Sequence, residues 1–286
     1  MTLISRESIS KILLILGFIS LSFFFISCSE EKIESQVADK PQTKKKGVRL
    51  ATLDWQPYVG QDLEGKGYVY ELIIEAFREE GIEVSIEFLP FARILNLARD
   101  GQIDGYFPEY MSEENRESYY YSDPYPGGDV GFLKLKKSNI HIRTERGMKR
   151  FQSLKDLRIG IVRGYTNTKE FDSASYLKKE EANSDLSNLK KLFFNRIDLI
   201  FIDPNVANYL ISTQLGGYTG SKDAYQFIDP GLEYKELYTC FSKKATHGQK
   251  YLRSFNKGLK KLKSKGRLDE ILKKHKFSNG RYQFSN

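Results

Sequence analysis

An alternation of strand-like and helix-like segments most constrains how this sequence can fold. Residues 47–55 favour a strand, residues 68–81 carry apolar side chains at helical spacing, and residues 82–90 again favour a strand. A helix pattern at 90–101, with Pro90 at its start, and a strand at 102–107 continue the series. Because parallel strands need a crossover connection, this order predicts an α/β unit around a largely parallel sheet.

A second series of the same kind follows a predicted strand at 129–137. It begins with a strand and a glycine turn, and Asp203–Pro204 opens its last helix. We therefore expect a second α/β unit. In chain order its segments are a strand at 154–164, helices at 166–177 and 184–196, a buried strand at 197–202, a helix at 203–215 and an extended run at 232–244.

Composition excludes several other classes of protein. The 286 residues are 40% hydrophobic, which is enough for packed cores and excludes collagen-like, coiled-coil and disordered chains. Cys28 and Cys240 are too few for a disulfide scaffold or a four-cysteine zinc site, and the three histidines are too far apart for a local zinc motif. We expect no metal and no cofactor, and we interpret Cys240 as a buried, inert thiol.

The N-terminus has the pattern of an export signal. Arg6 and Lys11 precede an apolar run at 12–26, which is shorter than the roughly 20 residues that span a bilayer. The run ends just before Cys28, so the segment resembles a bacterial lipoprotein signal with residues 1–27 removed and Cys28 lipidated. Residues 28–47 would then be a flexible tether. An ordinary secretory signal or an uncleaved anchor remains the alternative.

Positive charge is concentrated at the C-terminus. Residues 243–286 carry a net charge of +12, whereas the whole chain carries +8. The rest of the chain therefore has a net charge of −4. Leu252, Phe255, Leu259 and Leu262 follow helical spacing with lysines on the other faces, which is typical of a solvated amphipathic helix. Attraction to a membrane surface is the alternative. Export excludes nucleic acid as a natural partner.

Several segments together resemble a known family. They are ATLDWQPY (51–58), GKGYVYELIIEAF (65–77), GQIDGYF (101–107), ENRES, YYSDPYP, SLKDLRIGIVRGYTNTKEF (153–171), RIDLIFIDPNVANYL (196–210) and RLDEILKK. In this order, from about Val48 to Lys276, they resemble the bacterial extracellular solute-binding proteins of family 3, the polar amino-acid receptors of ABC importers.

The resemblance implies a two-lobed periplasmic-binding-protein fold of type II. Each lobe would be an α/β sandwich around a mainly parallel sheet, and ligand would lie between the lobes. Lobe 1 would comprise 48–134 and 241–286, and lobe 2 would comprise 135–240. Two crossing strands, within 131–137 and 237–244, would form the hinge.

The resemblance also assigns charged ligand-binding residues. Arg116 matches the family arginine that grips a ligand α-carboxylate, and Asp203 matches the carboxylate that receives a ligand ammonium group. The residues themselves leave other readings open. Arg116 also suits a surface ion pair with Glu113 or Glu117, and Asp203 also suits a helix N-cap. We expect Arg116 and Asp203 to face each other across the cleft.

Three further positions match the ligand-binding pattern, and one departs from it. Thr166 matches a threonine that helps to hold the carboxylate, although it could simply cap a helix. Trp55 and Phe91 match two apolar walls of the cleft, although a lone tryptophan is more often core. Glu109 lies where related receptors have small residues. It could neutralise Arg116 or select a ligand with an extra positive group.

Three functions fit these features. The first is an extracytoplasmic, membrane-anchored receptor that closes on an amino acid or similar small polar solute and presents it to an ABC permease. The second is an enzyme on the same fold, similar to cyclohexadienyl dehydratase, and the third is a ligand-sensing or surface interaction module. We favour the first, in which the protein is not an enzyme and acts as a monomer on the periplasmic side of the cell envelope.

Overall fold

The structure of the protein is a computed structural model. It describes residues 47–142, 148–217, 220, 223–228, 231–278 and 280–283. The predicted signal, Cys28 and nearly all of the predicted tether lie outside the described residues. None of the described helices is long and apolar enough to cross a membrane.

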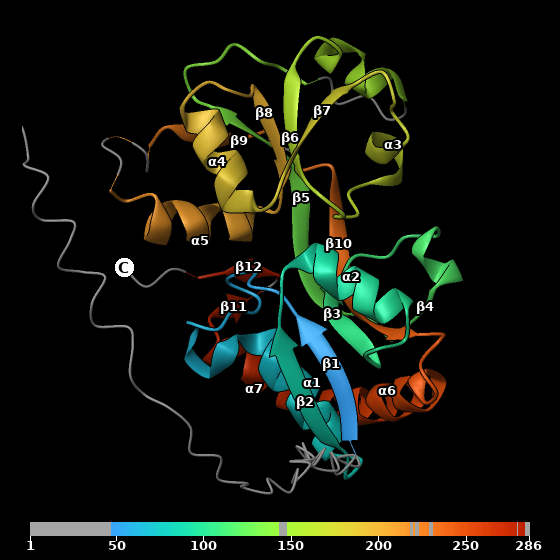
Figure 1. Ribbon diagram of the computed structural model, residues 1–286. Helices are drawn as coiled ribbons and strands as arrows, with labels where there is room; N and C mark the ends of the chain where they lie inside the picture. Colours follow the sequence, from blue (N-terminus) through green and yellow to red (C-terminus); the bar gives the residue numbers. More distant parts are fainter. Residues whose placement is uncertain are drawn as a thin grey trace, which may run out of the picture. The chain divides into compact units, whose positions relative to one another are not determined.

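The first α/β unit folds as its periodicity predicts. Strand β1 pairs in parallel with β2 on one side and with β3 on the other, and two helices make the crossovers (Figure 1). Pro90 is the N-cap residue of the second helix. The elements are β1 (Gly47–Thr52), α1 (Tyr68–Arg78), β2 (Glu83–Phe88), α2 (Phe91–Arg99) and β3 (Gly105–Glu109).

The second unit has a parallel core, and two of its strands, at 178–182 and 225–227, were not predicted from the pattern. Strand β6 pairs in parallel with both β7 and β8. The helix predicted at 166–177 is wrong in extent, because only α3 (Lys169–Asp172) is helical. The elements are β6 (Arg158–Val162), α3, β7 (Lys178–Ala182), α4 (Asp185–Phe193), β8 (Leu199–Ile202), α5 (Pro204–Gln214) and β9 (Tyr225–Phe227).

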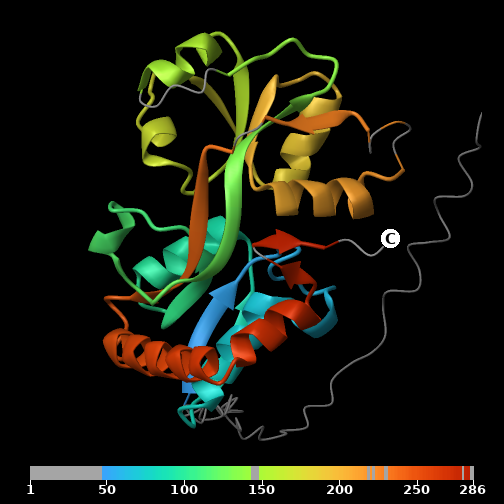
Figure 2. The ribbon, with the colours of Figure 1, turned by 180° about the vertical axis from the view of Figure 1, so that it is seen from behind.

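Two long strands connect the units. β5 (Tyr125–Leu135) and β10 (Glu233–Ser242) run side by side in both views (Figures 1 and 2). They pair antiparallel with each other, and β10 also pairs with β3 while β5 pairs with β8. The order β2-β1-β3-β10-β5-β8-β6-β7 therefore runs from one unit to the other. We call the unit of β1–β3 lobe 1 and that of β6–β9 lobe 2.

The C-terminal helices complete lobe 1. The amphipathic helix predicted from its apolar spacing is α6 (Gly248–Ser264), which buries Phe255, Leu259 and Leu262. It packs closely on α1, since a side chain at Gly258 would come within 1.9 Å of the Ala76 carbonyl oxygen. Short elements fill the remaining connections. The C-terminal and connecting elements are α7 (Arg267–Lys274), β11 (Phe277–Ser278), β12 (Arg281–Tyr282), β4 (Tyr119–Tyr121) and the 3-10 helices Glu64–Lys66, Asn115–Glu117 and Met148–Leu154.

Candidate functional site

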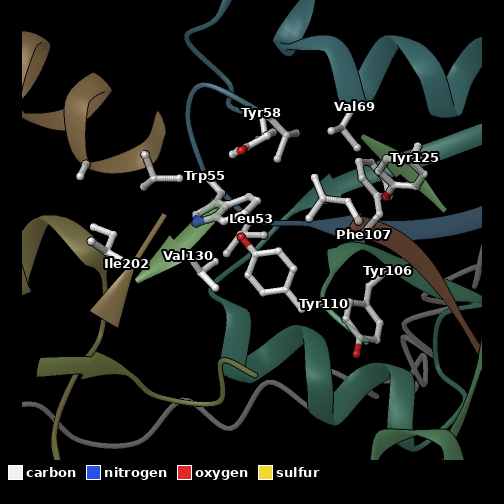
Figure 3. Packing of buried hydrophobic residues seen from close by; sticks show 14 of the residues in the cluster. Leu53, Trp55, Tyr58, Val69, Tyr106, Phe107, Tyr110, Tyr125, Val130 and Ile202 are labelled. Carbon is white, nitrogen blue, oxygen red and sulfur yellow. The ribbon is translucent and has the colours of Figure 1, made fainter. Parts of the chain in front are cut away.

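An aromatic cluster lies where the first strand leaves the sheet. Trp55 follows β1 in a tight turn in which its backbone N–H donates to the Val59 carbonyl at 2.8 Å. Its indole stacks on Tyr58, with ring centroids 4.6 Å apart, and meets the edge of Tyr110 at 5.8 Å. Figure 3 shows these three rings together. Only 8% of Trp55 is exposed, so the turn holds a large ring almost completely out of water.

Rings from the two lobes also meet. Phe91, the first residue of α2, contacts Tyr165 of lobe 2 in an edge arrangement at 5.3 Å. Tyr165 lies in the turn after β6, and Thr166 follows it. These residues line one small cavity together with Trp55. The structure therefore brings Trp55, Phe91 and Thr166 together, and their binding of a ligand stays a prediction.

Asp203 joins the lobes through hydrogen bonds. It follows β8 and is the N-cap of α5, where its Oδ1 accepts the backbone N–H of Asn205 at 2.6 Å and of Val206 at 3.4 Å. Its Oδ2 accepts the hydroxyls of Tyr58 at 2.7 Å and Tyr110 at 3.3 Å, both from lobe 1. Burial raises the pKa of Asp203 to about 7 against the opposite effect of these bonds. Asp203 is thus a helix cap that also faces lobe 1.

Glu109 is a buried carboxyl group at the end of β3. Its oxygens accept the Tyr106 hydroxyl at 3.1 Å and the Tyr110 backbone N–H at 2.8 Å. Burial raises its pKa to about 8, and the charge of Lys235 acts weakly in the other direction. Glu109 therefore holds a proton at neutral pH unless a positive group comes close.

Asp185 is a site residue that the sequence analysis missed. It is the first residue of α4, behind the N-cap Ser184, and only 6% of it is exposed. Its carboxylate accepts the Tyr165 hydroxyl at 3.3 Å and a hydrogen bond from Trp55, while burial raises its pKa to about 7. Its position just after a strand could have indicated a site residue, but the sequence pattern does not predict that strand, β7.

Arg116 differs from the expectation. It lies in the 3-10 helix Asn115–Glu117, where its Nε donates to Glu113 Oε1 at 3.1 Å and its Nη2 contacts Met111 Sδ at 2.8 Å. About half of its side chain is exposed. The short helical turn makes Glu113 the nearest partner, three residues away. Arg116 therefore faces neither Asp203 nor Glu109 in this structure.

A neighbouring residue, and not Thr166, caps the helix that follows. Thr168 is the N-cap of α3 and accepts the Phe171 backbone N–H at 3.3 Å. Thr166 is half-buried and lies outside the helix. Thr166 thus lines both the inner and the outer cavity and does not cap the helix.

Three neighbouring cavities surround these residues. The cleft cavity, of about 490 Å³, is lined by residues of both lobes, including Trp55, Phe91, Tyr165 and Asp185. The inner cavity, of about 20 Å³, shares the three rings and adds Glu109 and Thr166. The outer cavity, of about 690 Å³, lies on the other side of Thr166. A volume of several hundred cubic ångströms is typical of a small-molecule site.

Possible metal ligands and the one described cysteine bear on what this site can do. Among the residues that the structure describes, no group of three or more His, Cys, Asp or Glu could hold a metal ion. Cys240 is fully buried in β10, and burial raises the pKa of its thiol, which suits an inert side chain. Rings, buried carboxyl groups and tyrosine hydroxyls are what the cleft offers to a ligand.

Two α/β lobes, a shared pair of crossing strands and a cavity between the lobes define the type II periplasmic-binding-protein fold. Comparison with known proteins agrees with this. The chain belongs to the bacterial extracellular solute-binding proteins, family 3, whose family model matches residues 48–279.

One curated protein and several solved structures are similar to this chain. The probable histidine-binding protein of Campylobacter jejuni is 25% identical over 261 residues, which cover 88% of this chain and 93% of the relative. An ancestral arginine-binding protein solved with arginine is 19% identical, with a TM-score of 0.64 over 80% of this chain and 97% of its own. A histidine kinase sensor domain with similarity to periplasmic binding proteins is 14% identical, with a TM-score of 0.69. The match covers 80% of this chain and 95% of the sensor domain.

Proposed function

We propose that the protein is an extracytoplasmic receptor that binds an amino acid or a similar small polar solute between its lobes. The observation that carries this proposal is the cleft cavity, whose wall combines Trp55 and Phe91 of lobe 1 with Tyr165 and Asp185 of lobe 2. A solute that contacts both lobes stabilises the conformation in which they are together. The probable histidine-binding relative supports the same class of solute.

We propose further that the receptor serves an ABC importer. Family membership supports a location outside the cytoplasm, and lipidation of Cys28 would keep the protein at the membrane next to its permease. The predicted lobe boundaries, 48–134 with 241–286 and 135–240, place the hinge in β5 and β10. These two strands connect the sheets of the two lobes, so a small change along them would rotate one lobe against the other.

Binding without turnover is our proposal for the cleft. One observation favours the alternative of an enzyme on this fold, since the buried carboxyl group of Glu109 has a pKa of about 8, which suits proton transfer. An enzyme of the dehydratase kind would convert its substrate at catalytic amounts of protein. A receptor returns the same solute unchanged when the complex is denatured, and mass spectrometry of the released solute distinguishes the two.

A thermal-shift screen of amino acids and small amines tests the proposal. A solute at 100 times its dissociation constant adds about 2.7 kcal/mol to the free energy of unfolding, which is easily visible. Trp55→Ala should abolish the shift, and Phe194→Ala should keep it, because Phe194 is 51% exposed and lines none of the three cavities. If Trp55→Ala does not fold, Phe91→Ala serves instead. An unchanged shift in the folded cleft variant contradicts the proposal.

A further inference from the structure

Apart from tyrosines, the ionisable side chains that line the cleft and inner cavities are all carboxyl groups. Asp54, Asp62 and Asp185 line the cleft cavity, and Glu109 lines the inner one. None of the described lysines, arginines or histidines lines either cavity. Two of the carboxyl groups, Asp185 and Glu109, are more than nine-tenths buried. Burial makes these two carboxyl groups costly to ionise, and a positively charged ligand beside them would favour their ionised forms.

The walls between these carboxyl groups are aromatic. Trp55, Phe91 and Tyr165 line both cavities, so a ligand in the cleft would lie beside aromatic rings as well as carboxyl groups. Ring faces attract ammonium and guanidinium groups, by about 0.5–2 kcal/mol per contact as water is removed. The rings therefore favour the same sign of ligand charge as Asp185 and Glu109, by an independent interaction.

The positive side chains nearest to these groups line the outer cavity, and Lys235 is the one whose charge acts on Glu109. Lys169 and Lys235 line the outer cavity, among acidic residues, and Lys235 lies 3.8 Å from Glu233. Arg116 lines none of the three cavities and is paired with Glu113. The cleft cavity thus has anionic groups for a ligand cation but no guanidinium for a ligand carboxylate.

We propose that the solute is a small organic cation, an amine or guanidinium compound, that Asp185 and Glu109 recognise by its charge without a clamp on a carboxylate. This inference rests on the proposed function, because the cleft must be the solute site. It narrows the solute from polar molecules in general to cations, and it makes Asp185 and Glu109 the residues that determine specificity.

Proton release should accompany binding. Asp185 faces Trp55, Tyr165 and, at longer range, Tyr110, all of which are neutral. Glu109 interacts with tyrosine hydroxyls, the Cys240 thiol and one charged side chain, that of Lys235. With pKa values of about 7 and 8, Asp185 and Glu109 are partly protonated at neutral pH, and a bound cation favours their charged forms. Affinity for a cation should therefore rise at least about fivefold from pH 6 to pH 8.

Isothermal titration calorimetry with four probes tests the inference. Agmatine is a cation without a carboxylate, arginine adds the carboxylate, and glutamine and glutamate are the neutral and anionic comparisons. We expect agmatine to bind as tightly as arginine or tighter, and both more tightly than the other two. Tighter binding of arginine than agmatine would overturn the inference, and so would tighter binding of glutamine or glutamate, while the proposed function would stand. Binding of none of the four, nor of any solute in the thermal-shift screen, would overturn both.

Variants assign the effect to particular side chains. Asp185→Asn and Glu109→Gln should each weaken agmatine binding at least about tenfold and reduce its rise with pH. Glu114→Gln removes the same charge from the outer cavity and should change affinity less than about twofold, as should Arg116→Ala. Unchanged agmatine affinity in both Asp185→Asn and Glu109→Gln, or a tenfold loss in Arg116→Ala, would contradict the inference.

Discussion

Substitution of Glu109 by glutamine should flatten the dependence of stability on pH. Burial raises the pKa of this carboxyl group from 4.5 to about 8, so between about pH 5.5 and 7.5 the folded protein keeps a proton that the unfolded chain has lost. Stability is therefore greatest below the unfolded pKa and falls as pH rises. The slope is about 1.4 kcal/mol per pH unit, or about 2.7 kcal/mol across this window.

Glutamine fits the site as a neutral substitute. The protonated carboxyl group has one donor and one acceptor for its two partners, and an amide offers the same to the Tyr106 hydroxyl and the Tyr110 backbone N–H. Glu109→Gln should therefore unfold at a similar urea concentration near pH 5.5. Asp185 and Asp203 have raised pKa values as well, so some slope remains in both proteins.

The assay is urea unfolding at several pH values, followed by the emission of Trp55, the one tryptophan of the chain. The free energy of unfolding of the parent should fall toward pH 7.5, and Glu109→Gln should lose up to about 1.4 kcal/mol per pH unit of that slope. Equal slopes in the two proteins, or a parent that becomes more stable as pH rises, would refute the reasoning.

Two other substitutions test packing and the contact between lobes. Gly258→Ala should destabilise the protein by about 1–3 kcal/mol in urea unfolding, because its new methyl group overlaps the Ala76 carbonyl, whereas Gly217→Ala, with open space around it, should change stability by less than about 0.5 kcal/mol. Equal effects of the two glycine variants would contradict the close packing of α1 on α6. Tyr58→Phe removes a donor to buried Asp203 and should cost about 1–3 kcal/mol, with a measurable increase in the radius of gyration by X-ray scattering; a variant as stable as the parent would show that this bond does not join the lobes.

Periodicity predicted the elements that bury one continuous face. Helix α1 follows it closely, with Leu72, Ile73, Ala76 and Phe77 all buried, and its end is marked by Gly81 at a φ of +65°. Strand β7, with the sequence KKEEA, has no such face. It lies at the edge of the sheet and carries charges, so neither alternation nor apolarity indicates it. The sequence thus predicts those helices and strands that bury one face and expose the other.

The site was only partly predictable for a related reason. Trp55, Phe91, Glu109 and Thr166 line the inner cavity together, because each lies at or just after the end of a strand or at the start of a helix, where the carboxyl edges of the sheets meet. Asp203 lines none of the three cavities and is bonded to Tyr58 and Tyr110, which pack on Trp55.

Two positions show the limit of such reasoning. Asp185 depends on β7, which was not predicted, and Arg116 depends on the direction of a side chain in a short 3-10 turn. A pattern of residue types does not fix that direction, because Glu113 at three residues' distance offers a local partner.

The emission of Trp55 gives the most direct test of the central claim that a solute binds between the lobes. Since no other tryptophan exists in the chain and this ring lines the cleft and inner cavities, a bound solute must change its surroundings. Titration of the parent protein with agmatine should shift the emission saturably, with the same dissociation constant as calorimetry. Calorimetric binding without any change in Trp55 emission would place the solute elsewhere and contradict the account.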